Sequence, residues 1–92
     1  MAILREAYIE TECIKLAKKS GYNTRKVKFI ASNGAPDRIF FKSNHFFWCE
    51  FKNANGVLSE LQKHQQKLLK DAGQEVYNIN DIDLFSKLLK ST

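Results

Sequence analysis

The sequence contains little of what disulfide-rich, collagen-like or low-complexity proteins are made of. Its 92 residues include two cysteines, four glycines and one proline. The two cysteines are too few for a disulfide framework, and no Cys-x-x-Cys pair indicates a zinc site, so we expect reduced, structural thiols. The low glycine and proline content excludes a collagen-like or linker-like chain. We therefore expect residues 1–92 to fold as a single domain.

The chain also lacks a long apolar run. No segment approaches the roughly 20 residues that a membrane-spanning helix needs, and the first ten residues, MAILREAYIE, reach charged side chains almost at once. We expect a soluble, cytoplasmic protein without membrane association. Positive charge is in excess, since 15 Lys and Arg face 10 Asp and Glu. This excess favours a polyanionic partner such as nucleic acid, because Lys and Arg displace counterions from phosphates.

Periodicity and turn residues divide the first half of the chain into four elements. Apolar residues at helical spacing predict a helix over residues 3–20. Alternation predicts strands over residues 25–31, 37–42 and 45–52, the last two forming a hairpin. On the last strand, one face carries Phe and Cys side chains, while the opposite face carries Phe46, Trp48, Glu50 and Lys52.

Three further elements follow. Ser59 is placed to cap a helix that Gly73 ends, and residues 75–79 form a short strand. Asp81 is placed to cap a closing helix. The expected inner side of the helix after Ser59 consists of Leu61, Leu68, Leu69 and Ala72. The sequence thus predicts an α/β fold of order α-β-β-β-α-β-α, with a mixed sheet flanked by helices.

The residues most indicative of chemistry lie in the predicted hairpin. Asp37 begins one strand, and Glu50 and Lys52 lie two residues apart on its partner. Because strand side chains alternate, these three can converge at one end of the sheet. Two carboxylates and the main-chain carbonyl of Phe51 would suit Mg²⁺ or Mn²⁺. Such an ion would activate a water molecule for attack on a phosphodiester, and Lys52 would hold that water or stabilise the negative transition state.

These motifs resemble those of the PD-(D/E)XK nuclease superfamily, in which an acid, a second acid and a lysine follow this order of elements. Within it, several segments resemble the virus-type replication-repair nuclease (VRR-NUC) family, and the similarity runs from Glu6 to about Leu89. The segments are Gly34-Ala35-Pro36-Asp37-Arg38, Trp48-Cys49-Glu50-Phe51-Lys52, Leu58-Ser59-Glu60-Leu61-Gln62, Ala72-Gly73 and Val76-Tyr77. The resemblance implies a restriction-endonuclease-like core and a metal-dependent DNA nuclease, with Asp37 and Glu50 as metal ligands and Lys52 as the catalytic lysine.

The resemblance also implies roles for residues on two helices. The family's Ser-x-x-Gln element falls on Ser59 and Gln62, and Gln62 would orient the metal-bound water or contact a phosphate. The family carries an acid on its first helix, which Glu10 matches best, either as a direct ligand or through water. Glu6, one turn earlier, remains an alternative, while Glu12 lies on another face.

The expected partner is DNA, and no small-molecule cofactor is expected. Since no helix-turn-helix, zinc finger or base-reading motif is present, we expect recognition of DNA shape. The small domain resembles stand-alone, phage-encoded members of the family, which leads us to expect a symmetric homodimer cutting branched, four-way (Holliday) junctions. A flap- or end-directed nuclease and a non-catalytic DNA-binding module are the alternatives. Candidate DNA contacts are Lys26, Lys28, Arg38, Ser59, Lys63, His64 and Lys67.

Overall fold

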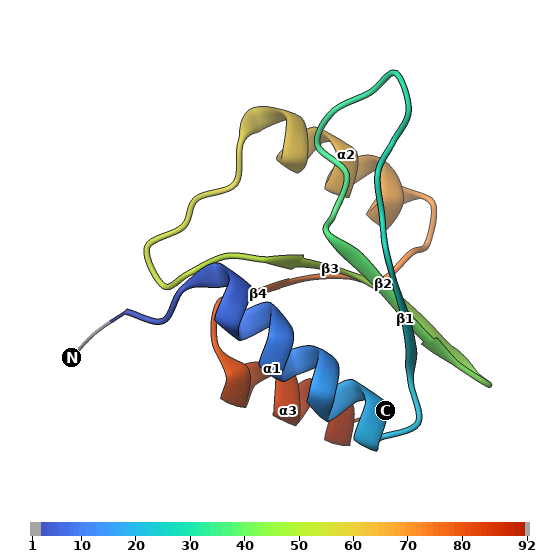
Figure 1. Ribbon diagram of the computed structural model, residues 1–92. Coiled ribbons are helices and arrows are strands. Elements are labelled where there is room, and N and C mark those ends of the chain that lie inside the picture. Colours follow the sequence, from blue (N-terminus) through green and yellow to red (C-terminus); the bar gives the residue numbers. More distant parts are fainter. Residues whose placement is uncertain (1–2, 92) are drawn as a thin grey trace.

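The computed structural model describes residues 3–91 and contains seven elements in the predicted order (Figure 1). They are α1 (Glu6–Lys19), β1 (Asn23–Lys26), β2 (Arg38–Lys42), β3 (His45–Phe51), α2 (Glu60–Asp71), β4 (Val76–Ile79) and α3 (Ile82–Lys90). The predicted α/β fold of order α-β-β-β-α-β-α is confirmed. Within residues 3–91, none of the helices has the length and apolar character needed to cross a membrane.

The four strands form one mixed sheet in the order β1-β2-β3-β4. β2 pairs antiparallel with both β1 and β3, whereas β3 and β4 are parallel. A parallel pair needs a crossover connection, which α2 supplies across one face of the sheet. α1 and α3 lie against the opposite face (Figure 1).

The hydrophobic core lies between the sheet and the pair of helices α1 and α3. β3 directs Phe47, Cys49 and Phe51 into this core, where each is fully buried. Phe85 of α3 packs against Phe40 of β2, with ring centroids 5.3 Å apart. As predicted, alternation along β3 leaves the intervening residues, Glu50 among them, on the face that α2 crosses.

The predicted strand over residues 25–31 is wrong in its position. β1 is Asn23–Lys26, and its last residue, Lys26, pairs with Arg38, the first residue of β2. The N–H of Val27 still donates a bond of 2.9 Å to the carbonyl of Asp37, but β2 has no residue opposite residues 28–31, although their side chains alternate. They instead form the start of a loop, residues 27–37, that extends past α2 (Figure 1).

The predicted apolar inner side of α2 is also wrong. Ser59 caps this helix, as predicted, but Leu61 and Leu68 are about half exposed, whereas Gln66 is only 4% exposed. Gln62 and Gln66 lie four residues apart and thus share one helical face. That face meets polar side chains of the sheet, so the helix turns amides rather than leucines inward.

Candidate active site

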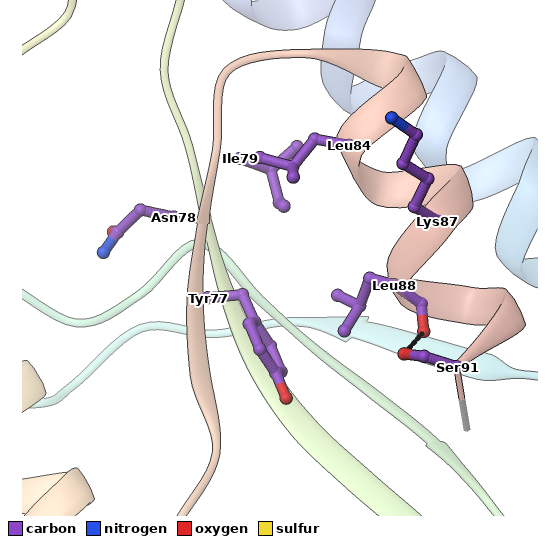
Figure 2. A pocket seen from close by; sticks show the side chains of 7 residues that line it. All are labelled: Tyr77, Asn78, Ile79, Leu84, Lys87, Leu88 and Ser91. Carbon is purple, nitrogen blue, oxygen red and sulfur yellow. Dashed lines mark hydrogen bonds between the residues drawn. The ribbon is translucent and has the colours of Figure 1, made fainter.

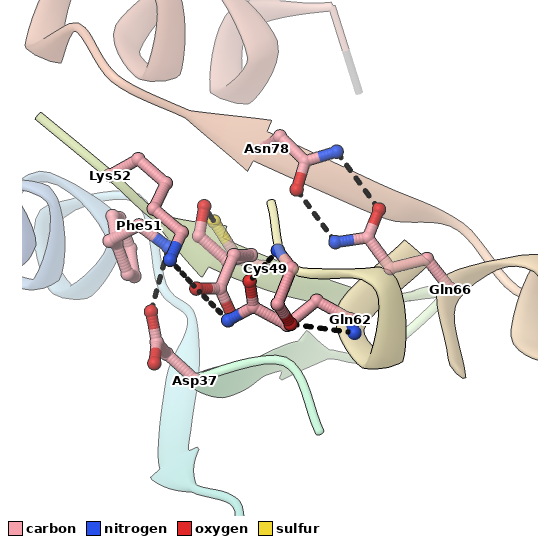
Figure 3. A network of polar contacts seen from close by, with 9 residues as sticks. Asp37, Cys49, Phe51, Lys52, Gln62, Gln66 and Asn78 are labelled. Carbon is pink, nitrogen blue, oxygen red and sulfur yellow. Dashed lines mark hydrogen bonds and ion pairs between the residues drawn. The ribbon is translucent and has the colours of Figure 1, made fainter. Parts of the chain in front are cut away.

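The β2–β3 hairpin brings together the three residues of the predicted motif, of which Asp37 and Lys52 are labelled in Figure 3. The carboxylate of Asp37, just before β2, accepts a hydrogen bond of 2.7 Å from the main-chain N–H of Phe51. This bond holds Asp37 against β3 at the position between Glu50 and Lys52. The ammonium of Lys52 lies 3.5 Å from Oε2 of Glu50. Two acids and a lysine therefore meet where β2 begins and β3 ends.

Glu50 is buried and has one carboxylate oxygen without a partner. The residue is 1% exposed, and its Oε2 accepts a hydrogen bond of 3.0 Å from Nε2 of Gln62. Its Oε1 is buried and has no hydrogen-bond partner among the described residues. Burying a polar atom without a partner is costly, more so when it is charged. A cation bound at Oε1 would remove this cost.

Burial and like charge raise the pKa of both carboxyl groups. The pKa of Glu50 is raised to about 7, mainly by burial and then by the negative charge of Asp37, against the effect of Lys52. Burial also raises the pKa of Asp37; the Phe51 N–H lowers it, and the charge of Glu10 raises it further. Carboxylates that disfavour each other's ionisation form an electronegative site, which a divalent cation would stabilise.

The donor set fits Mg²⁺ or Mn²⁺. Both cations prefer hard oxygen ligands, which Asp37 and Glu50 supply, and the main-chain carbonyl of Phe51 is adjacent in sequence. Within residues 3–91, no three or more His, Cys, Asp or Glu side chains gather as a metal-binding group. The protein would therefore provide two carboxylates and a carbonyl and leave the other positions to water, as is common for Mg²⁺.

α1 places two acids near this site. Oε2 of Glu10 accepts a hydrogen bond of 2.6 Å from Nε of Arg38, and both side chains are largely buried. Arg38, a candidate DNA contact, is thus paired with α1. The charge of Glu10 raises the pKa of Asp37, and that of Glu6 raises the pKa of Glu50. Glu10 and Glu6, the two candidates for the acid on the first helix, therefore both act on the site electrostatically.

The start of α2 fixes Gln62 through a reciprocal cap. Oγ of Ser59 accepts a bond of 3.1 Å from the main-chain N–H of Gln62, and Oε1 of Gln62 accepts one of 2.9 Å from that of Ser59. Because Oε1 is held in this way, Nε2 of the same amide is directed at Glu50. Ser59 therefore acts here as a helix cap, and Gln62 connects the cap to the buried acid.

A second amide pair continues this contact between α2 and the sheet. Gln66 and Asn78 exchange two hydrogen bonds of 2.7 and 2.9 Å (Figure 3). Asn78 is the partner of Glu50 in the register of β3 and β4, so the pair lies next to the acid. This pair was not expected from the sequence. The four-residue spacing of Gln62 and Gln66 is the signal that points to it.

Three lysines line a groove of about 290 Å³ between α2 and β4. Lys63 pairs with Glu60 at 3.3 Å and Lys67 with Asp71 at 2.7 Å, while Lys70 also lines the groove. Exposed pairs of this kind contribute little stability, so the ammonium groups can exchange carboxylates for phosphates. Of the other candidate DNA contacts, His64 is exposed on α2, and Lys26 and Lys28 are exposed at the end of β1 and beyond it.

A separate pocket of about 400 Å³ lies between β4 and α3 (Figure 2). Tyr77, Ile79, Leu84 and Leu88 give it a largely apolar lining. It lies beside α3, whereas Glu50 and Gln62 meet on the face that α2 crosses. The pocket is therefore not part of the acidic site.

The arrangement of the mixed sheet and its three helices is that of a restriction-endonuclease-like α/β core. No family model matches the sequence, and no curated protein matches it. A solved structure described as a "VRR_NUC domain" is similar in fold, with a TM-score of 0.84 and 18% sequence identity. The similarity covers 92% of this chain and 94% of the other. This chain has the fold of a VRR-NUC domain, as the sequence motifs predicted.

Proposed function

We propose that this protein is a divalent-metal-dependent DNA endonuclease. The observation that carries the proposal is the meeting of Asp37, Glu50 and Lys52, together with the buried Oε1 of Glu50, which has no hydrogen-bond partner among the described residues. The VRR-NUC fold supports activity of the nuclease type. The net charge of +5 is suited to a polyanionic substrate.

Asp37, Glu50 and the carbonyl of Phe51 would hold Mg²⁺ or Mn²⁺, with Glu10 as a further contact through water. When bound, the ion supplies a Lewis acid that lowers the pKa of a water molecule and neutralises phosphate charge. The ammonium of Lys52, anchored 3.5 Å from Glu50, is positioned to hold the attacking water or to stabilise negative charge on the phosphate. Gln62 keeps the carboxylate of Glu50 in one orientation.

We further propose that the substrate is branched DNA and that the enzyme is a symmetric homodimer. The groove of Lys63, Lys67 and Lys70 offers a path for the phosphate backbone that starts beside the acidic site. The apolar pocket beside the edge strand β4 is the surface proposed for a second copy. If two β4 strands pair antiparallel about an axis perpendicular to the sheet, both acidic sites lie on the same face, where the two strands of a four-way junction can be cut.

The test is cleavage of end-labelled four-way junction, flap, single-stranded and linear duplex DNA with Mg²⁺ or Mn²⁺. Lys52→Met is the matched control, since it keeps an unbranched side chain only one atom shorter and removes the charge. Metal-dependent, symmetric nicking of the junction that Lys52→Met loses is the expected result. Cleavage of flaps or ends alone would support nuclease activity and contradict the proposal that the enzyme resolves junctions.

Two further measurements separate the remaining alternatives. Sedimentation velocity at working concentration is expected to show a dimer, and a monomer would contradict paired cutting. DNA binding without any cleavage would favour a non-catalytic module. Affinity that does not fall between two salt concentrations would contradict DNA binding through phosphates.

A further inference from the structure

The loop of residues 27–37 connects β1 to the acidic site and extends past α2 (Figure 1). Its last residue is Asp37, whose carboxylate is bound to β3. Its path therefore begins at the sheet, projects from the molecule and returns directly to the proposed metal site. A structural change in this loop would therefore move Asp37 and alter the proposed metal site.

Besides the bond of Asp37 to β3, three contacts hold the loop to the body of the protein. The ring of Phe29 packs edge-on against Trp48 of β3, with centroids 6.2 Å apart. Oγ of Ser32 accepts a hydrogen bond of 3.1 Å from Gln65 of α2. Gly34 approaches α2 so closely that a Cβ atom there would lie 2.6 Å from the carbonyl oxygen of Leu61. The loop is thus preorganised, although it projects from the surface.

The tip between these contacts presents one apolar side chain to solvent. Ile30 is 93% exposed, and the next residue, Ala31, has a φ of 61°. A positive φ is unfavourable for a residue with a Cβ atom and persists where neighbouring contacts impose it. Ile30 is also β-branched and therefore stiff at χ1. The tip combines a rigid backbone with a rigid apolar side chain.

The charge around this tip matches DNA. Two exposed lysines precede Ile30: Lys26, the last residue of β1, and Lys28 on the outgoing limb of the loop. Proteins that kink DNA insert apolar side chains between base steps while basic residues hold the backbone. The energetic cost of unstacking is lowest where bases are already poorly stacked, as at mismatched or unpaired positions.

We propose that Ile30 is a wedge that enters between stacked bases at the branch point of DNA, while Lys26 and Lys28 contact the flanking phosphates. The proposal rests on the proposed function and adds to it a reason for the choice of substrate. A wedge separated from Asp37 by the six loop residues 31–36 would place a branch point beside the site that cuts. Linear duplex resists the same insertion, because each of its base steps is fully stacked.

The test uses four-way junctions that carry 2-aminopurine at each position flanking the branch, with Ca²⁺ in place of Mg²⁺ to permit binding without cleavage. Wild-type protein is expected to raise the fluorescence at one or more positions by unstacking the probe. Ile30→Ala is expected to abolish the rise and to bind the junction roughly tenfold more weakly, because it loses most of the apolar side chain that is buried between bases, with unchanged affinity for linear duplex. Ile30→Leu, which keeps an apolar side chain of equal size, is expected to retain both.

The wedge proposal would be overturned if Ile30→Ala gave the same fluorescence rise and the same preference for the junction as wild type. It would also be overturned if wild-type protein did not bind the junction. Thermal unfolding of both variants should match wild type, because the side chain is exposed. Failure of the wedge and of the nuclease are distinguishable. If wild type unstacks the probe but cuts nothing in Mg²⁺, the wedge stands without the nuclease. If Ile30→Ala cuts junctions at the wild-type rate in Mg²⁺, the nuclease stands without the wedge.

Discussion

The side-chain amide of Gln62 donates a hydrogen bond to Oε2 of Glu50 across 3.0 Å. The same amide accepts a bond from the main chain of Ser59 and thereby closes the cap of α2. A local feature of one helix therefore fixes the orientation of a buried acid on another element. One side chain therefore stabilises both the start of α2 and the acidic site. Comparison with a substitution that removes a helix cap elsewhere separates its effect on stability from its effect on the site.

Gln62→Ala is expected to reduce metal-dependent cleavage roughly 10- to 100-fold, because Glu50 loses the contact that orients it. It should also lower the free energy of unfolding by about 1 kcal/mol, because the main-chain N–H of Ser59 loses the side-chain oxygen that accepts its bond. Asp81→Ala is the control, since Asp81 caps α3 by accepting a bond of 2.9 Å from the N–H of Asp83. It should cost similar stability in urea and leave the cleavage rate unchanged. Equal losses of cleavage in both variants would contradict an orienting role for Gln62.

The pKa of Glu50 predicts how stability without metal depends on pH. The group is protonated up to about pH 7 in the folded protein and up to about 4.5 when unfolded. Between these values the folded state binds more protons, so the free energy of unfolding falls as pH rises, by about 3 kcal/mol over the interval. Asp37, whose pKa is also raised, acts in the same direction.

Glu50→Gln removes this ionisation and is expected to be more stable than wild type at pH 8 in EDTA. The two proteins should differ little at pH 4. Adding Mg²⁺ at pH 8 should raise the Tm of wild type and have a smaller effect on the variant. Urea unfolding and thermal scans measure these effects. A variant less stable than wild type at pH 8 would show that ionised Glu50 is compensated by contacts other than a metal.

Gly34→Ala is expected to destabilise the fold by about 2–3 kcal/mol. The residue has a φ of 93°, and its Cβ would lie 2.6 Å from the carbonyl oxygen of Leu61, which is main chain and cannot move aside easily. Gly73→Ala is the matched control, with a φ of 87° and nothing within 4 Å of the added atom. It should cost only about 1 kcal/mol from backbone strain. Similar losses for the two variants in urea unfolding would contradict the close approach of the loop to α2.

Both thiols are expected to resist modification in the folded protein. Burial, as the largest cause, raises the pKa of Cys13 to about 12 and that of Cys49 well above its ordinary value. Little thiolate is present at pH 8, and the sulfur atoms lie inside the core. A colorimetric disulfide reagent should therefore detect no rapidly reacting thiol in native protein and two after unfolding in urea. Rapid reaction of either cysteine in native protein would show that the core opens there.

Some features of this protein follow from neighbouring residues alone, and the sequence was sufficient to predict them. The two-residue alternation along β3 predicted that Phe47, Cys49 and Phe51 share one face of the strand. Ser59 and Asp81 marked the starts of helices, because a side-chain oxygen satisfies main-chain N–H groups only two or three residues away. The same alternation predicted that Asp37, Glu50 and Lys52 can meet at the end of a hairpin.

Other features depend on what each element meets in space, and only the tertiary structure decided them. The alternation after Lys26 resembled a strand, but β2 begins opposite Lys26, and after one bond from the N–H of Val27 to the carbonyl of Asp37 the chain leaves the sheet as a projecting loop. The leucines of α2 predicted an apolar inner side, yet the face of the sheet below it carries Glu50 and Asn78, so Gln62 and Gln66 turn inward. Local sequence sets which side chains share a face. The polarity of the opposing surface, which comes from distant residues, determines which face is buried.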